Sequence, residues 1–294
     1  MSRNILATAV LVAAAHAAAV PAAAQDAPAE KKLPKWSDTA ELGWVATSGN
    51  SESSSFGFKD TLTRTGKDDL FELKLGGIKV KTTTTTVYAV GNAAAVFEDK
   101  VTDTTAENYF LTGRYDRNIT PKFFWFAGAG WDRNIPAGIQ DRYVGFGGVG
   151  NNWFTGERRK WRTDYSATGT KQDNVVDDPT FNDTFFGVRV TSTFLQQFGA
   201  GDNGTYGNDT IIDENLDETS DWRVNMTNWV SLNFTSHLAL KVSLQWLYDN
   251  LPSLEEINIY DQPLPSPPAV KIGTTQVPVD DLDSIFTTAL VIKY

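Results

Sequence analysis

The sequence contains no cysteine, and only 2 of its 294 residues are histidine. Without cysteine, the fold can depend neither on disulfide bonds nor on thiolate metal sites. Beyond residue 20, no unbroken apolar run is long enough to cross a bilayer as a helix. Basic residues are also scarce, 26 against 36 acidic ones, which argues against nucleic-acid binding because that function needs a basic surface.

The amino-terminal residues have the features of a secretory leader. Arg3 gives a positive start, residues 5–20 form an apolar stretch, and residues 22–24 are three alanines suited to cleavage. We therefore predict a signal peptide over residues 1–24 and a periplasmic linker over residues 25–37, where Ala, Pro and charged residues show no periodicity. The mature chain would keep 25 basic and 36 acidic residues, and it could enter a membrane only through strands.

Alternation of apolar and polar residues runs through most of the remaining chain. Residues 238–248 show it best, with six apolar or aromatic residues on one face. We predict twelve strands, at residues 38–48, 52–65, 69–82, 105–119, 122–134, 139–154, 159–172, 182–198, 206–218, 220–235, 237–249 and 283–294. The segment 206–218 alternates least clearly. The fold class expected for residues 38–294 is all-β, a twelve-stranded antiparallel transmembrane β-barrel.

The lengths of the connections support an even number of strands. With both ends of the barrel in the periplasm, every second connection should be a short periplasmic turn. The two longest connections, residues 83–104 and 250–282, both fall on the opposite side. Residues 87–97 are apolar enough for a thirteenth strand, but an odd count is unusual in bacterial barrels, so we place them in an extracellular excursion.

The last twelve residues, 283–294, resemble the final strand of an outer-membrane barrel. One face carries Phe286, Leu290, Ile292 and the terminal Tyr294. We interpret these four residues as the carboxy-terminal assembly signal, with outer-membrane lipid and the barrel-assembly machinery as partners. The expected location is therefore the bacterial outer membrane, reached by export through a cleaved signal peptide.

Two segments resemble a known family. Residues 41–52 read ELGWVATSGNSE, and residues 237–243 read HLALKVS before a loop and a terminal strand. Both are similar to an uncharacterised family of salt-induced outer-membrane proteins, a domain of unknown function, and the resemblance covers residues 38–294. It implies a barrel with an envelope role and brings no catalytic residues. The third connection and the last loop are longer than is usual in that family.

Projecting the alternation inward gives a set of candidate lumen residues. Eight are basic: Lys59, Lys74, Arg114, Arg162, Arg189, Arg223, Lys241 and Lys293. Four on the same parity are acidic: Glu41, Glu72, Asp116 and Asp164. Counting strand ends makes the balance nine against eight. Basic rings line anion-selective pores, whereas pairing of these charges, or an acidic loop folded inward, would fill the lumen. Twelve strands leave both outcomes open, since barrels of about eight strands are filled and those of roughly sixteen are open.

Catalytic and metal-binding features are weak. His16 leaves with the leader, and His237 adjoins the short turn at Thr235 and Ser236. Outer-membrane phospholipases use a serine–histidine pair. A histidine in a turn usually has no catalytic role, so we expect that the protein is not an enzyme. Acidic residues gather at 202–221 and 280–283, without the spacing of a calcium loop. We expect a solvated acidic face there, with no metal and no cofactor.

Three functions follow from these features. The first is an outer-membrane barrel with an envelope role and a narrow, anion-leaning channel, whose small solute the sequence does not identify. The second is a non-conducting structural or adhesive barrel with partner-binding surface loops, which a lumen plugged by residues 250–282 would favour. The third is an outer-membrane hydrolase that uses His237.

Overall fold

The computed structural model describes residues 35–47, 51–90, 95–135, 137–179, 181–261 and 270–294. The predicted signal peptide and residues 25–34 of the predicted linker lie outside these ranges. The chain divides into a unit of residues 1–33 and a unit of residues 34–294, and all the described residues belong to the second unit. No helix in the described ranges is both long and apolar enough to cross a membrane.

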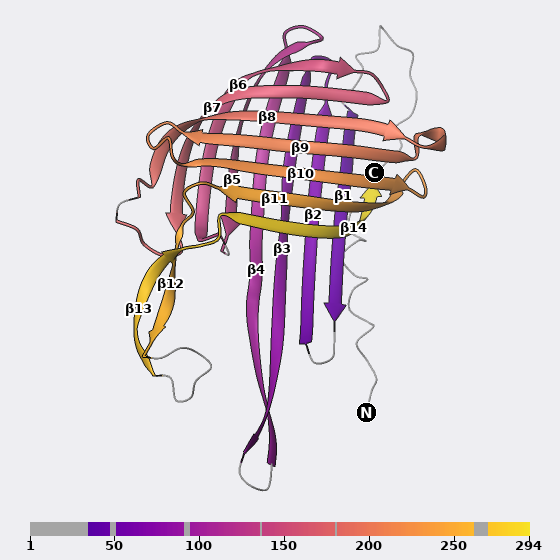
Figure 1. Ribbon diagram of the computed structural model, residues 1–294. Helices are drawn as coiled ribbons and strands as arrows, with labels where there is room; N and C mark the ends of the chain where they lie inside the picture. The colour runs from indigo at the N-terminus through magenta and orange to yellow at the C-terminus, as the bar shows by residue number, and fades with distance from the viewer. Residues whose placement is uncertain (1–34, 48–50, 91–94, 136, 180, 262–269) are drawn as a thin grey trace, which may run out of the picture. The chain divides into compact units, whose positions relative to one another are not determined.

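The second unit is a closed antiparallel barrel of twelve strands, which confirms the predicted fold class. Its strands are β1 (Lys35–Thr47), β2 (Ser51–Thr65), β3 (Asp69–Val90), β4 (Ala95–Asn118), β5 (Phe123–Asn134), β6 (Ile139–Thr155), β7 (Arg159–Asn174), β8 (Thr184–Phe198), β9 (Gly204–Asn215), β10 (Trp222–Asn233), β11 (Leu238–Asp249) and β14 (Leu282–Lys293). Each strand pairs with its neighbours in sequence, and β8–β11 cross in front of β1–β4 in Figure 1.

The barrel closes where the first strand meets the last. β1 pairs with β2 on one side and with β14 on the other, and β14 also pairs with β11. Asp38 and Tyr294 exchange two backbone hydrogen bonds, of 2.9 and 3.1 Å, at this seam. Closure leaves the sheet without an edge, so every wall strand has partners on both sides. Tyr294 therefore lies at the seam as well as at the end of the chain.

Connections differ between the two ends of the barrel. The terminus end, where β1 begins and β14 finishes, carries the short turns at residues 66–68, 119–122, 156–158, 199–203 and 234–237. The loop end, opposite to it, carries the longest connection, between β11 and β14. This arrangement matches the separation of short turns from long connections that the sequence predicts.

Strand positions also agree closely with the sequence, with two differences in extent. β1 begins at Lys35, so residues 35–37 of the predicted linker belong to the first strand. β3 and β4 continue past the predicted limits to Val90 and Ala95. Residues 87–90 and 95–97 thus end one strand and begin the next, and they add no wall strand.

Two regions at the loop end that were predicted as connections contain strands. β3 and β4 remain paired as far as Val90 and Ala95, whereas the pairing of β2 with β3 stops at Thr84, so the two strands leave the wall as a ribbon (Figure 1). The predicted loop of residues 250–282 contains a separate hairpin of β12 (Leu254–Tyr260) and β13 (Lys271–Pro278). Most of the hairpin's described side chains are exposed, so the described part of this loop does not fill the lumen.

The barrel inverts the usual distribution of apolar residues. The large apolar side chains that are buried, such as Phe124 and Phe126, point inward, and the alternate positions on the outer face are exposed. The exposed apolar residues of the outer face include Leu42, Leu75, Leu111, Val149, Val188, Val190, Ile212, Val230, Leu232, Leu240, Val242, Phe286 and Leu290. Exposed aromatic residues lie toward both ends of this face, with Trp36, Trp125 and Trp153 at the terminus end and Tyr143 and Phe186 at the loop end. A continuous apolar surface of this size needs a nonaqueous partner.

Candidate functional site

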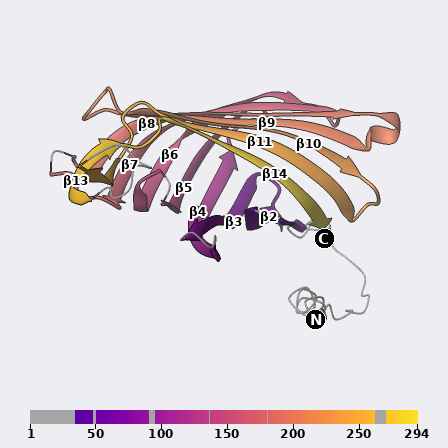
Figure 2. The ribbon, with the colours of Figure 1, turned by 60° about the horizontal axis from the view of Figure 1, so that its bottom comes forward.

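All eight basic residues predicted for the lumen lie on the lumen face of their strands. Phe124 and Phe126 are buried and face the lumen. Strand partners point to the same side of a sheet, so the register of each pair identifies the lumen-facing positions of the next strand. These positions include Lys59, Lys74, Arg114, Arg162, Arg189, Arg223, Lys241 and Lys293. Figure 2 shows the wall of β9–β11 facing β2–β6 across this interior.

Four of the lumen charges form one compact cluster, hereafter the β4–β7 cluster: Arg114, Asp116, Arg162 and Asp164. Arg114 lies 2.6 Å from Asp116 and 2.6 Å from Asp164, and Arg162 lies 2.9 and 3.2 Å from the same two carboxylates. The side chains of Asp116 and Asp164 are only 7% and 4% exposed. Because these contacts span β5 and β6, they tie together strands that do not pair directly.

The β4–β7 cluster rests on aromatic rings. The guanidinium carbon of Arg114 lies 3.8 Å from the centre of the Phe126 ring, and that of Arg162 lies 4.4 Å from the centre of Phe124. Stacking on a ring face suits a planar guanidinium, which is more weakly hydrated than an ammonium group. Gly150 leaves room for the ring of Phe124, because a Cβ atom at this position would overlap that ring.

One side of the lumen is filled, whereas the other remains accessible. On β7, the inward side chains from Asp164 to Gln172 are all buried. On β2 and on the loop-end half of β14, the described inward side chains are only half-buried, as Lys59, Thr61 and Thr287 illustrate. The lumen is therefore packed beside β7, whereas the inward side chains of β2 and of that half of β14 keep part of their exposure.

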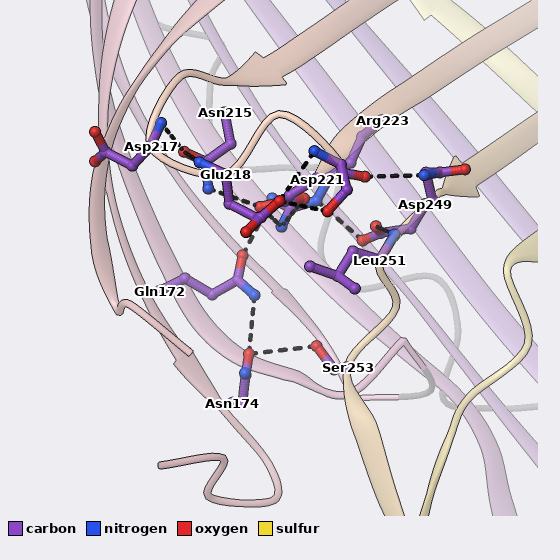
Figure 3. A network of polar contacts seen from close by, with 12 residues as sticks. Gln172, Asn174, Asn215, Asp217, Glu218, Asp221, Arg223, Asp249, Leu251 and Ser253 are labelled. Carbon is purple, nitrogen blue, oxygen red and sulfur yellow. Dashed lines mark hydrogen bonds and ion pairs between the residues drawn. The ribbon is translucent and has the colours of Figure 1, made fainter. Parts of the chain in front are cut away.

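A second polar network, centred on Arg223, closes part of the loop end (Figure 3). Arg223 lies 2.9 Å from Asp221 and 2.9 Å from Asp249, and it donates a 3.2 Å hydrogen bond to Gln172. Gln172 and Asp221 are each 2% exposed. Asn215 donates a hydrogen bond of 3.0 Å to Asp221. The network thus connects β7 with the turn before β10 and with β11.

The network continues into the long connection after β11. Gln172 donates to Asn174, and Ser253 also donates to Asn174, at 2.8 and 3.3 Å. Asp249 accepts a hydrogen bond from the backbone N–H of Leu251. These bonds fix the start of the connection against β7 at the loop end.

Next to this network is a small pocket of about 20 Å³ whose lining includes three arginines, Arg142, Arg189 and Arg223. Each arginine has a carboxylate partner: Arg142 lies 2.9 Å from Asp132, and Arg189 lies 2.6 Å from Asp213. Arg142, Asp132 and Asp213 were not among the residues predicted from the sequence to face the lumen. Their parity within β5, β6 and β9 is the signal that could have found them.

The accessible half of the lumen has its own charges. Lys241 binds both oxygens of Glu41, at 2.8 and 2.9 Å, and Lys74 lies 2.7 Å from Glu72. Lys59 makes no hydrogen bond or ion pair with any described residue, although Glu41, Lys74, Lys241 and Asp209 are the charges nearest to it. Among the described residues, Lys59 therefore has no carboxylate partner, and neither has Lys293, whose ammonium group donates a hydrogen bond to Asn233.

The expected acidic face at residues 202–221 is not a single surface. Asp209 accepts a hydrogen bond from the indole of Trp229, Asp213 pairs with Arg189, and Asp221 pairs with Arg223, all toward the lumen. Glu218 stays in the turn after β9, where hydrogen bonds from the hydroxyl and the backbone N–H of Ser220 lower the pKa of its carboxyl. Among the described residues, no group of His, Asp and Glu is arranged to hold a metal ion.

The remaining predicted residues lie at the terminus end. Phe286, Leu290 and Tyr294 are exposed on the outer face of β14 or at its end, and Ile292 shares their parity. The Ser236 hydroxyl and His237 Nδ1 are 2.8 Å apart in the exposed turn between β10 and β11. No carboxylate in the described part of the chain bonds to the His237 ring.

Together these features define an antiparallel barrel with an apolar outer surface and an ion-paired, partly filled lumen. The chain belongs to the family described as "Protein of unknown function, DUF481", whose model matches residues 40–258. The chain matches no curated protein sequence.

Solved structures with a similar chain path are barrels. The NanC porin is 8% identical, with a TM-score of 0.46, and the similarity covers 86% of this chain and 98% of the porin. The translocator domain of the autotransporter NalP from Neisseria meningitidis is 8% identical, with a TM-score of 0.41, covering 88% and 86% of the two chains. Identity this low assigns no activity to the chain.

Proposed function

We propose that the protein is inserted in the bacterial outer membrane after export by its leader. The exposed apolar outer face with aromatic residues toward both ends supports this placement, because it matches the lipid-facing band and the aromatic girdles of such barrels. The short turns would then face the periplasm and the long connections the cell surface. The resemblance to salt-induced proteins extends the proposal to an envelope role under changing salt, tested by comparing protein levels in low and high salt.

Within that placement, the function we favour is a narrow channel for small solutes. The observation that carries it is the half-filled lumen, in which inward side chains of β7 are buried but those of β2 remain accessible. Water and small ions could pass along the accessible half. The packed half, together with the β4–β7 cluster, would keep the passage narrower than an empty twelve-stranded barrel.

The selectivity that we propose is a weak preference for anions. Paired charges largely cancel, since each of Lys74, Arg114, Arg162, Arg189, Arg223 and Lys241 lies within 4 Å of a carboxylate. The preference would then depend mainly on Lys59 and Lys293, the two lumen-facing cations without a carboxylate partner among the described residues. A ring of unpaired basic residues would give a much larger preference.

Single-channel recording of the refolded mature protein under a salt gradient tests this function. We expect small, steady openings with a reversal potential slightly displaced toward that of the anion. Lys59→Glu should move the reversal potential to the cation side, because two lysines would then face four carboxylates near the passage. The matched control is Lys171→Glu, which makes the same change on the exposed outer face of β7.

A silent bilayer with correctly folded protein would favour a second function, that of a non-conducting barrel with partner-binding loops. The exposed hairpin of β12 and β13 and the ribbon of β3 and β4 support this alternative. Binding of the protein to whole cells or to extracellular matrix, lost when the hairpin is removed, would be its test.

A hydrolase is a third candidate, supported by the 2.8 Å contact between Ser236 and His237. Its geometry is incomplete, because no carboxylate orients the ring within the described residues. Phospholipase activity that disappears in His237→Ala would establish this function. Unchanged background activity in that variant would remove it.

A further inference from the structure

A groove of about 370 Å³ lies on the outer face of β2–β4, near the loop end. It is lined by Ser54, Phe56, Phe58, Gly77, Lys79, Lys81 and Tyr109. These residues alternate with the lumen-facing Lys59 and Gly76, so they point away from the lumen. The groove is therefore separate from the passage considered above.

The floor and walls of the groove are apolar. Gly77 forms the floor, where a Cβ atom would overlap the ring of Tyr109, so the absence of a side chain allows that ring to lie against the backbone. Phe58 and Tyr109 are the strand partners of Gly77 on either side. Below the groove, toward the terminus end, the same face continues with Leu75 and Leu111. Acyl chains lying along the barrel would find an apolar path along β3 and β4 here, beside Asp60 of β2.

The upper border of the groove is basic. Lys79 lies 2.9 Å from Glu107, its strand partner, and these two charges offset each other. Lys81 is exposed and makes no hydrogen bond or ion pair with any described residue. A bulge in the pairing of β3 with β4 lies between Val80 and Lys81, a few residues before the ribbon leaves the wall at Thr84. Lys81 thus provides an ammonium group without an ionic partner among the described residues, directly above an apolar groove.

The height of the groove fits the edge of a membrane. The backbone carbonyl of Glu107 accepts a hydrogen bond from Ile135, which begins the connection after β5. The row of Lys79 and Glu107 therefore lies where the pairing of β4 with β5 ends, whereas β2 and β3 stay paired as far as Thr84. Aromatic and basic side chains at the edge of an apolar band are the usual arrangement at the level of lipid headgroups.

We propose that this groove binds a phosphorylated glycolipid of the outer leaflet, with its phosphate at Lys81 and Lys79 and an acyl chain over Gly77 and Phe58. Charge complementarity carries the choice, because Lys81 lacks an anionic partner among the described residues and a phosphate oxygen accepts hydrogen bonds from an ammonium group. The leaflet follows from the loop end facing the cell surface, so the inference rests on the membrane orientation in the proposed function.

Binding of lipids to the refolded full mature protein in detergent tests the inference. The probes are purified lipopolysaccharide, the same lipid after enzymatic dephosphorylation, and phosphatidylglycerol. The measurements are the temperature at which the folded band is lost on a gel and the amount of lipid retained after gel filtration. We expect the phosphorylated glycolipid alone to raise that temperature and to be retained.

Two variants of opposite effect sharpen the test. Lys81→Gln should weaken binding about fivefold, as expected for the loss of one lysine near a charged lipid surface. Glu107→Gln should strengthen binding about fivefold because it releases Lys79 from its partner. A damaged fold could not produce such tightening. Lys171→Gln, on the outer face of β7, is the control and should change neither measurement.

Three results would overturn the inference. Equal binding of the dephosphorylated glycolipid would show an apolar surface without phosphate recognition. Preferential binding of phosphatidylglycerol would assign the groove to another lipid. Unchanged affinity in both Lys81→Gln and Glu107→Gln would place binding elsewhere on the barrel.

Flotation with lipid vesicles separates this inference from the proposed function. Protein that does not float with vesicles would contradict the membrane placement, and with it both proposals. Protein that floats and conducts, but does not discriminate among the three lipids, contradicts the groove alone. Protein that floats and binds the phosphorylated glycolipid in a silent bilayer contradicts only the channel.

Discussion

At the scale of single residues, the β4–β7 cluster should be the most sensitive part of the barrel. Asp164→Leu would leave Arg114 and Arg162 sharing Asp116 as their only carboxylate. Removing one partner from a buried ion pair is costly because the remaining charge stays desolvated. We expect a loss of about 3–5 kcal/mol in the free energy of unfolding, measured by urea titration in vesicles.

The control for this variant is an exposed ion pair. Arg158 and Asp202 lie 2.8 Å apart at the terminus end, with side chains 65% and 37% exposed. Asp202→Asn removes the charge and keeps a residue that tolerates the positive φ of 54° at this position. We expect a change below about 1 kcal/mol. A similar loss in both variants would contradict the special role of the β4–β7 cluster.

A second prediction at this scale concerns two glycines of one strand, β6. A Cβ atom on Gly150 would overlap the Phe124 ring and lie 2.7 Å from a carboxylate oxygen of Asp164, whereas Gly145 has nothing within 4 Å. Gly150→Ala should therefore destabilise the barrel by about 1–3 kcal/mol through overpacking. Gly145→Ala should change little, and urea titration of the two variants side by side decides the matter.

Sequence alternation predicted which face each lumen residue occupies, but not its partner. Arg162 shows why, since its 2.9 Å contact is with Asp116, 46 positions earlier in the sequence and three strands away round the wall. Such a contact depends on how far the strands tilt and on how deeply side chains from opposite parts of the wall reach. Neither quantity is written in the periodicity of one strand. The sequence therefore left a basic lumen and a lumen of paired charges both open, and most of these charges are paired.

At the scale of elements, the wall was predictable because each strand has two different environments on its two faces. Lipid-facing and lumen-facing positions then alternate in polarity. The ends of β3 and β4 lack that contrast, because beyond Thr84 they pair only with each other. Thr82–Thr86 and the residues opposite them carry no apolar alternation, so the ribbon was interpreted as an irregular excursion.

The ribbon should therefore be dispensable for folding. Thr84 and Val101 are strand partners, so residues 85–100 can be replaced by Asn-Gly, a pair suited to a two-residue hairpin turn. We expect the free energy of unfolding to change by less than about 1 kcal/mol, because an isolated two-stranded ribbon adds little stability. Urea titration and the shift of the folded band on a gel measure this. Loss of the folded band would show that the ribbon is part of the folding unit.

At the scale of the whole molecule, the unequal filling of the lumen unites the fold with the proposed channel. Ion pairs and rings brace β4–β8, where the inward side chains of β7 are buried. The opposite half keeps space, and Trp229 is the large aromatic side chain of β10 that faces it. Its ring lies 4.8 Å from Lys241 Nζ and over Gly207, and its indole donates to Asp209.

Trp229 should accordingly set the width of the passage. Trp229→Ala removes the ring and leaves Asp209 without its indole donor, so single-channel conductance should rise and the preference for anions should fall. Trp246→Ala is the matched control, because Trp246 lies on the outer face of the adjacent β11. Its conductance should equal that of the unmodified protein. If Trp229→Ala conducted no better than the control, ions would not pass through the accessible half of the lumen. That result would favour the second function, a non-conducting barrel with partner-binding loops.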